Sequence, residues 1–374
     1  MFTRMKVLIF TVTTGEGHNR TADAVEAAFI DKKIECRKLD VYKYVNKFLG
    51  ATVSRGYLLS IDSMSSSYSR IYKHLENRKA SDNKATPSAL FFGMVARQLL
   101  DYVRKYSPDV IVSTHIFAAI PVEIMKKKYG IRARTVGVIT NFTIHPYWED
   151  VKSIDHLVIP SERLGWQCEK KGIDEKKLLS FGIPLRMEFS LYTEKTEARK
   201  RLGLRTDLPV VLMMGGSMGY GSLCGDLERI DKVRKEFQIV VVCGSNKRVY
   251  KKISAGSFSH NVKVMGYTKE ISLIMDASDC IVTKPGGITV SEALVKNLPL
   301  LLTNPIPGHE ERNMNFLINT GAAIGVYEKC HVDELVWQFF NDEERRAGMS
   351  EAVKALRRPG SAERLADFLI SEGD

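Results

Sequence analysis

Short apolar and β-branched runs alternate along this chain with longer amphipathic stretches. The short runs predict strands, and the amphipathic stretches predict helices that cover a parallel sheet. In the first half, the predicted strands are 6–10, 34–39, 109–113, 135–139, 156–159 and 178–181. In the second half, they are 210–214, 238–242, 262–265, 280–283, 300–303 and 323–326. Each set is sufficient for a doubly wound α/β sheet of its own.

The boundary between two predicted domains falls near residues 182–196. A glycine and a proline end the first pattern there, and a polar segment leads into the next predicted helix. We therefore expect a first domain over 1–185, a second over 190–358, and a C-terminal helix at 360–374 that packs back on the first. Paired α/β domains of this kind bind ligands in a cleft, where the carboxyl ends of the strands present their loops.

Residues 42–107 interrupt the alternation with helical patterns that are rich in aromatic side chains. The overlapping segment 51–148 contains 14 Lys and Arg but only 6 Asp and Glu. Apolar aromatics and positive charge in one segment predict an interfacial membrane site. The alternative is that these aromatics, including Phe91 and Phe92, belong to the core of the first domain.

The length of 374 residues, with 44% apolar and 26% charged side chains, predicts folded domains and excludes a disordered or collagenous chain. Six cysteines are scattered singly, without a C-x-x-C pair. This spacing argues against a disulfide framework or a zinc site and favours a reducing compartment. No apolar stretch reaches 18 residues, so we expect a soluble or peripheral protein.

The net charge of +11 is concentrated in the first half of the chain. Residues 1–190 contain 30 Lys and Arg against 20 Asp and Glu, whereas residues 191–374 contain 25 against 24. A one-sided positive field suits an anionic surface, either membrane lipid or nucleic acid. Solvated lysines without a partner explain the same excess.

The first predicted strand runs into the loop sequence TTGEGH at 13–18, which a predicted helix follows. Glycines at such a turn let the backbone approach a ligand, but the loop lacks the G-x-G-x-x-G pattern of dinucleotide-binding folds. His18 falls in the first turn of the helix, where the positive end of the helix dipole keeps imidazole neutral and available as a base. A capping or packing histidine is the alternative.

Two glycine-rich turns follow strands of the second predicted domain. The first, MMGGSMGYG at 213–221, contains four glycines and a serine, and the second is KPGGITVSE at 284–292. Backbone N–H groups in such turns can point at a phosphate. One turn alone has a structural explanation, but two on one domain fit a diphosphate.

Further polar side chains follow the second glycine-rich turn. Glu292 lies about one and a half turns into the predicted helix, where its carboxylate can accept both hydroxyls of a ribose. The segment NPIPGHEERN at 304–313 is a proline-rich loop that opens a polar helix, and its donors and acceptors can read sugar hydroxyls. Glu310 and Glu311 are also simply favourable in the first turn of a helix.

The run KPGGITVSEALVKNLPLLLTNPIPGHEERN at 284–313, with MMGGSMGYGS upstream, resembles the donor-binding half of MurG-like glycosyltransferases of the GT-B fold. GEGH at 15–18 and ITNFTIHPYW at 139–148 are similar to the diacylglycerol β-glycosyltransferases. That family comprises bacterial processive glucosyl enzymes and plant monogalactosyldiacylglycerol synthases, and the likeness covers almost the whole chain. It implies a GT-B architecture of two doubly wound Rossmann-like domains that face each other across a cleft.

The resemblance also implies roles for individual residues. The UDP diphosphate would be held by Gly215, Gly216, Ser217, Gly286, Gly287, Ile288 and Thr289. The ribose would bind Glu292, the uracil would pair with the main chain of Gly266 and Tyr267, and the donor sugar would meet His309, Glu310 and Asn313. His18 would be the catalytic base, with Gly17, Asn141 and His145 around the acceptor. Many relatives have Asp at the position of Asn141 and Gln at the position of His309.

The implied reaction is an inverting transfer of a hexose, glucose rather than galactose, from a UDP-sugar to the hydroxyl of diacylglycerol. The product is a β-glycosyl glycolipid at a membrane surface. The chain contains no D-x-D pair to hold a metal against the diphosphate, so we expect no metal and no cofactor. The expected partners are a UDP-hexose, the lipid acceptor and an anionic membrane, with no nucleic acid, and the expected location is peripheral on the cytoplasmic face.

Three alternatives compete with this function. Transfer to a polyprenyl-linked acceptor, as in lipid II synthesis, uses the same donor chemistry. A UDP-sugar 2-epimerase shares the architecture but needs no basic lipid-facing surface. A nucleic-acid-binding protein would explain the charge of +11 but has no use for the glycine-rich turns, and its binding would weaken steeply with salt.

Overall fold

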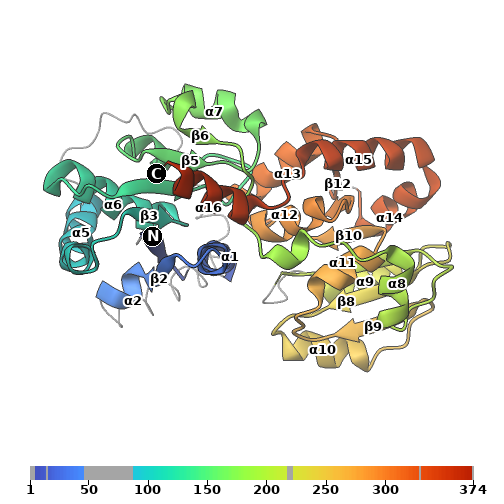
Figure 1. The fold of residues 1–374 in the computed structure, drawn as a ribbon. Helices are drawn as coiled ribbons and strands as arrows, with labels where there is room; N and C mark the ends of the chain where they lie inside the picture. Colours follow the sequence, from blue (N-terminus) through green and yellow to red (C-terminus); the bar gives the residue numbers. More distant parts are fainter. Residues whose placement is uncertain (1–4, 14–15, 46–86, 217–221, 328–329, 373–374) are drawn as a thin grey trace. The chain divides into compact units, whose positions relative to one another are not determined.

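The chain forms two compact units, seen in a computed structural model that describes residues 5–13, 16–45, 87–216, 222–327 and 330–372 (Figure 1). The first unit comprises residues 1–187, 307–309 and 360–374. The second comprises residues 188–306 and 310–359.

A parallel sheet of six strands forms the centre of the first unit, in the order β2-β1-β3-β4-β5-β6. The strands are β1 (Lys6–Thr11), β2 (Glu35–Asp40), β3 (Val110–Ser113), β4 (Arg134–Val138), β5 (His156–Val158) and β6 (Leu178–Leu179). The central strands are buried because helices cover both faces of a parallel sheet, which is why they read as continuous apolar runs.

Helices pack on both faces of this sheet. They are α1 (Glu16–Asp31), α2 (Val41–Val45), α5 (Pro87–Tyr106), α6 (Ile116–Tyr129), α7 (Gly165–Lys170) and α16 (Ser361–Ser371), with short 3-10 helices at η1 (Pro146–Asp150), η2 (Glu162–Leu164), η3 (Glu175–Lys177) and η4 (Met187–Phe189). On one face, α16 packs against α1 and buries Leu365 and Leu369 beside Val25 and Phe29. The C-terminal helix is therefore part of the first unit.

The aromatic region that interrupts the strand pattern is described only at its two ends, by α2 and α5. The middle of the region, residues 46–86, lies outside the described residues. Phe91 on α5 packs against the apolar cluster on the second face of the sheet and stacks with Tyr42 at a ring distance of 5.9 Å. For Phe91, the core alternative is therefore correct. Leu90 and Met94 of the same helix are exposed.

The second unit also has a parallel sheet of six strands, in the order β12-β11-β10-β7-β8-β9. The strands are β7 (Val210–Met214), β8 (Gln238–Val242), β9 (Asn261–Met265), β10 (Cys280–Thr283), β11 (Leu300–Leu302) and β12 (Ala323–Gly325). Each of the 12 predicted strands is thus present in the chain, with bounds that differ by at most two residues.

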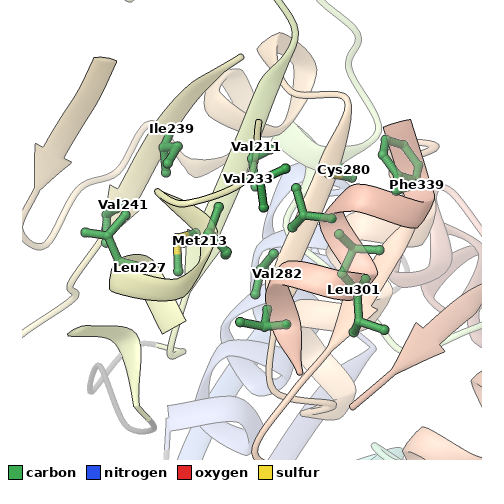
Figure 2. Packing of buried hydrophobic residues seen from close by; sticks show 14 of the residues in the cluster. Val211, Met213, Leu227, Val233, Ile239, Val241, Cys280, Val282, Leu301 and Phe339 are labelled. Carbon is green, nitrogen blue, oxygen red and sulfur yellow. The ribbon is translucent and has the colours of Figure 1, made fainter. Parts of the chain in front are cut away.

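Helices again connect and cover the strands of the second unit. They are α8 (Lys195–Arg201), α9 (Leu223–Ile230), α10 (Lys247–Ser254), α11 (Ile271–Ala277), α12 (Gly287–Val295), α13 (His309–Asn319, in this unit from Glu310 onward), α14 (Val332–Asn341) and α15 (Glu343–Leu356). Strand residues such as Val211, Val241 and Val282 pack against Leu227 of α9 and Phe339 of α14 in one apolar core (Figure 2). None of the described helices is long and apolar enough to cross a bilayer.

Each sheet contains a strand reversal, where the chain crosses from one side of the first strand to its other side. In the first unit, the chain passes from β1 to β2 on one side and then to β3 on the other. In the second unit, it passes from β7 through β8 and β9 and then returns to β10 on the opposite side of β7. The loops that leave the carboxyl ends of two such strands diverge and leave a crevice for a ligand. The TTGEGH loop and both glycine-rich turns follow strands at these reversals.

Candidate active site

His18 lies in the first turn of α1, directly after the loop that leaves β1. Its Nδ1 is 2.9 Å from the carbonyl oxygen of Thr114 and 3.2 Å from Oγ1 of Thr140. A carbonyl can only accept, so the Nδ1 of His18 carries the proton and Nε2 of the neutral ring carries a lone pair. Burial lowers the pKa of His18 to about 4, so the ring is neutral near pH 7. The side chain therefore has the protonation state of a base.

The loop before His18 is held by side chains that the sequence analysis did not single out. Asp40, at the end of β2, accepts hydrogen bonds from the backbone N–H and the hydroxyl of Thr13, at 3.1 and 2.5 Å. Asn19 donates to Thr13 at 3.3 Å and accepts from Thr11 at 3.1 Å. The ends of β1 and β2 are thus tied to the start of α1, which fixes the position of His18. Gly17 lies within this first turn.

A second histidine, His115, lies beside His18 and was not predicted. The two ring centroids are 4.3 Å apart, and the rings meet edge to face at 78°. His115 is the N-cap of α6, where its Nδ1 accepts the backbone N–H of Phe117 at 3.0 Å. Burial lowers the pKa of His115 far below its usual value, so this ring is neutral as well.

His145 joins the same cluster from the loop after β4. Its side chain caps η1 by accepting the backbone N–H of Tyr147, on whose ring it stacks at 5.4 Å. Phe117 lies between the histidines, 5.1 Å from the His115 ring and 6.4 Å from the His145 ring. The structure thus brings His18 and His145 into one aromatic cluster. Asn141 is half-buried on the loop that also carries Thr140.

In the second unit, the described start of the first glycine-rich turn lies beside the second turn. Gly215 and Gly216 directly follow β7, and Gly216 has a φ of +73°. A Cβ atom on Gly216 would lie 3.3 Å from Cε of Lys284, which begins the turn after β10. The backbone conformation therefore favours glycine here, and a Cβ atom would in addition require the Lys284 side chain to shift by a few tenths of an ångström. Ser217 lies outside the described residues.

The second turn opens α12, with Gly286 as the N-cap and Gly287, Ile288 and Thr289 in the first helical turn. The first N–H groups of a helix have no partner within the helix, and together with the helix dipole they favour an anion. Glu292 follows on α12 and is almost wholly buried. Its role toward a ribose stays a prediction.

Glu310 and Asn313, which we expected to meet the donor sugar, hold loops together in the structure. The carboxylate of Glu310 accepts from Nζ of Lys284 at 2.6 Å and from the backbone N–H of Ile306 at 2.9 Å. The amide of Asn313 donates to the carbonyl of Pro285 at 2.9 Å. These bonds tie the turn after β10 to the loop after β11 and to α13. A direct contact of either side chain with a sugar stays a prediction.

Of the remaining predicted donor residues, Gly266 and Tyr267 belong to the second unit, and His309 belongs to the segment 307–309 of the first unit. Gly266 and Tyr267 directly follow β9, and the Tyr267 side chain is exposed. His309 is the first residue of α13. Asp226 of α9 anchors the loop after β11 by accepting from the amide of Asn304 at 2.9 Å. Within the described parts of the chain, no group of three or more His, Cys, Asp or Glu side chains could hold a metal ion.

Two family models match the chain. The model described as Monogalactosyldiacylglycerol (MGDG) synthase matches residues 18–185, and the Glycosyltransferase family 28 C-terminal domain matches residues 210–365. The first match contains His18 and His145, and the second match contains both glycine-rich turns.

Similar proteins include two kinds of glycolipid synthase. A processive diacylglycerol beta-glucosyltransferase of Bacillus pumilus is 27% identical, over 100% of this chain and 97% of that protein. A probable monogalactosyldiacylglycerol synthase 3, chloroplastic, of Oryza sativa subsp. japonica is 30% identical, over 94% of this chain and 72% of that protein.

Solved structures with a similar fold include MurG from Acinetobacter baumannii, with a TM-score of 0.66 and 14% identity over 99% of this chain and 100% of that one. A UDP-GlcNAc 2-epimerase from Neisseria meningitidis, bound to UDP-GlcNAc, has a TM-score of 0.59 and 14% identity over 98% and 100% of the two chains. At these identities the likeness concerns the fold, and it confirms the predicted GT-B architecture.

Proposed function

We propose that this chain, which belongs to the family of diacylglycerol glycosyltransferases and monogalactosyldiacylglycerol synthases, transfers a hexose from a UDP-sugar to the hydroxyl of diacylglycerol. The relatives named for this chemistry match the chain along nearly its whole length. The observation that carries the proposal is the tautomer of the neutral His18 side chain. Its Nδ1–H is committed to the Thr114 carbonyl, so Nε2 is an acceptor for the proton of an alcohol.

The reaction that fits this arrangement is a single displacement with inversion. Nε2 of His18 takes the proton of the acceptor hydroxyl while the hydroxyl oxygen attacks the anomeric carbon of an α-linked sugar. The bond from that carbon to the UDP oxygen breaks on the opposite face, and a β-glycoside forms. The Thr114 carbonyl keeps the imidazole in the required tautomer and supports the positive charge that it gains.

UDP leaves with negative charge growing on its diphosphate. The turn at Gly215 and Gly216 and the N-terminus of α12 lie at the strand reversal of the second unit, where backbone N–H groups can stabilise that charge. Lys284 adds a cation beside the turn, although Glu310 balances it. In this proposal neither a metal nor a cofactor takes part, so chelation by EDTA leaves the rate unchanged.

The proposed location is the cytoplasmic face of a membrane, as a peripheral protein. Residues 1–190 hold a surplus of 10 positive charges over negative ones, from 30 Lys and Arg against 20 Asp and Glu. In the same part of the chain, Leu90 and Met94 are exposed one helical turn apart on α5. Exposed apolar residues together with basic charge support contact with an anionic lipid surface.

The deciding experiment incubates the protein with labelled UDP-glucose or UDP-galactose and one acceptor at a time. Diacylglycerol in mixed micelles is expected to yield a β-glycosyl lipid, with UDP-glucose the better donor. A polyprenyl-linked acceptor or no acceptor tests the other two reactions, and an epimer formed from the nucleotide sugar alone would contradict the proposal. His18→Ala serves as the inactive control.

A further inference from the structure

The imidazoles of His18 and His115 are in opposite tautomeric states. In His18, Nδ1 donates to the Thr114 carbonyl, which leaves Nε2 as an acceptor. In His115, Nδ1 accepts the N–H of Phe117, so the proton of the neutral ring is on Nε2. The two neighbouring rings thus offer one hydrogen-bond acceptor and one hydrogen-bond donor.

Neither Nε2 atom is used inside the protein. Within residues 5–13, 16–45, 87–216, 222–327 and 330–372, we find no hydrogen bond to Nε2 of His18 or of His115. Both residues are half-buried rather than fully buried. An N–H donor that has no protein partner in the described part of the chain and lies beside the reacting base is available to an acceptor atom of a ligand.

Diacylglycerol carries the matching pair of groups. Its free hydroxyl is a donor, and the carbon next to the hydroxyl-bearing carbon holds an ester whose carbonyl is an acceptor. The ring of Phe117 lies 5.1 Å from His115 and 5.8 Å from Tyr147, so apolar surface for the lipid adjoins the two histidines. A lipid substrate that carries a hydrogen-bond donor and a hydrogen-bond acceptor on adjacent carbons therefore fits the two Nε2 atoms.

We propose that His115 is a second acceptor-binding residue, whose Nε2–H donates to the ester carbonyl next to the hydroxyl that His18 deprotonates. This inference rests on the proposed function, because it names how the same site recognises its lipid. It assigns His115 a role beyond capping α6: the choice of an ester-linked lipid and the orientation of its hydroxyl toward His18.

The test compares an ester acceptor with an ether acceptor. A 1,2-dialkylglycerol has the same hydroxyl and chains as diacylglycerol but lacks the carbonyl. The wild-type enzyme should show about tenfold lower kcat/KM on the ether lipid, the effect of one hydrogen bond. In His115→Asn, which can still cap α6, the ratio of kcat/KM on the ester lipid to kcat/KM on the ether lipid should fall about tenfold, to about one. The ester preference then disappears.

The control is His331→Asn, the same change at the N-cap of α14 in the second unit, which should keep the wild-type preference. The inference is overturned if His115→Asn retains the ester preference. It is also overturned if the wild-type enzyme uses both lipids equally well, and that result does not depend on whether the variant folds. Failure of the proposed function looks different, because the wild-type enzyme would then glycosylate neither glycerolipid.

Discussion

Lys284 and Glu310 form an ion pair of 2.6 Å that joins the turn after β10 to α13. The Glu310 side chain is only 4% exposed, and the Lys284 stem passes Gly216 at the end of β7. The pair therefore holds the start of the second glycine-rich turn against α13 and keeps the Lys284 stem beside Gly216.

Lys284→Met should destabilise the second unit, because it leaves a buried carboxylate without its counter-ion. Removing one partner of a buried pair typically costs about 3 kcal/mol of the free energy of unfolding. The double variant Lys284→Met with Glu310→Gln should recover part of that loss, since no charge is then left buried. Urea unfolding of the three proteins measures this, and a double variant no more stable than Lys284→Met would contradict it.

Gly216→Ala should weaken UDP binding. At a φ of +73°, an alanine costs about 1 to 2 kcal/mol, and its Cβ would press on Lys284. The turn must shift, and the Kd for UDP should rise about tenfold by calorimetry. Gly348→Ala is the matched control because a Cβ there meets nothing within 4 Å in helix α15. That variant should bind UDP normally and gain up to about 1 kcal/mol of stability.

His18→Ala should abolish transfer while UDP binding survives. Loss of a positioned base lowers kcat by about a hundredfold to ten thousandfold. The donor-binding turns belong to the other unit, so the Kd for UDP is expected to stay near the wild-type value. Near-normal turnover of the variant would show that another group is the base.

The stability of the protein should fall as the pH is lowered from 6.5 to about 4, in part because of His18. Its pKa is about 4 in the folded chain and 6.5 when unfolded, so in this window only the unfolded state gains the proton. The resulting loss in the free energy of unfolding is absent above pH 6.5 and reaches roughly 3 kcal/mol below the folded pKa of about 4. The lowered pKa of His115 likewise reduces the stability of the folded state as the pH falls.

Unfolding by urea across this pH window, for the wild-type protein and for His18→Asn, measures the contribution of His18. The variant should lose less stability on acidification, with a residual slope from His115. Identical slopes for the two proteins would mean that His18 is solvated and titrates normally.

The pattern of apolar and polar positions was enough to predict the α/β class and the place of each strand. It sufficed because strands buried on both faces read locally as short β-branched runs, and Val210–Met214 is buried along its whole length. The turns at Gly216 and Gly286 and the position of His18 at a helix start are local features too. Strand ends were less certain, and β6 is two residues shorter than expected.

Contacts between distant parts of the chain could not be read from the sequence. The strand order β2-β1-β3-β4 places His18, His115 and Thr140 together, although each follows a different strand. The same order sets Asp40 against Thr13. Such pairs depend on which strands become neighbours, and no local periodicity encodes that choice.

The sequence by itself determined two doubly wound sheets, a histidine at one strand reversal and glycine-rich turns at the other, because each depends on residues close together in the chain. Only the tertiary structure decided the tautomer of His18, the presence of His115 at its side and the use of Glu310 as a brace for Lys284. The physical reason is that protonation, burial and ion pairing are set by what packs against a side chain.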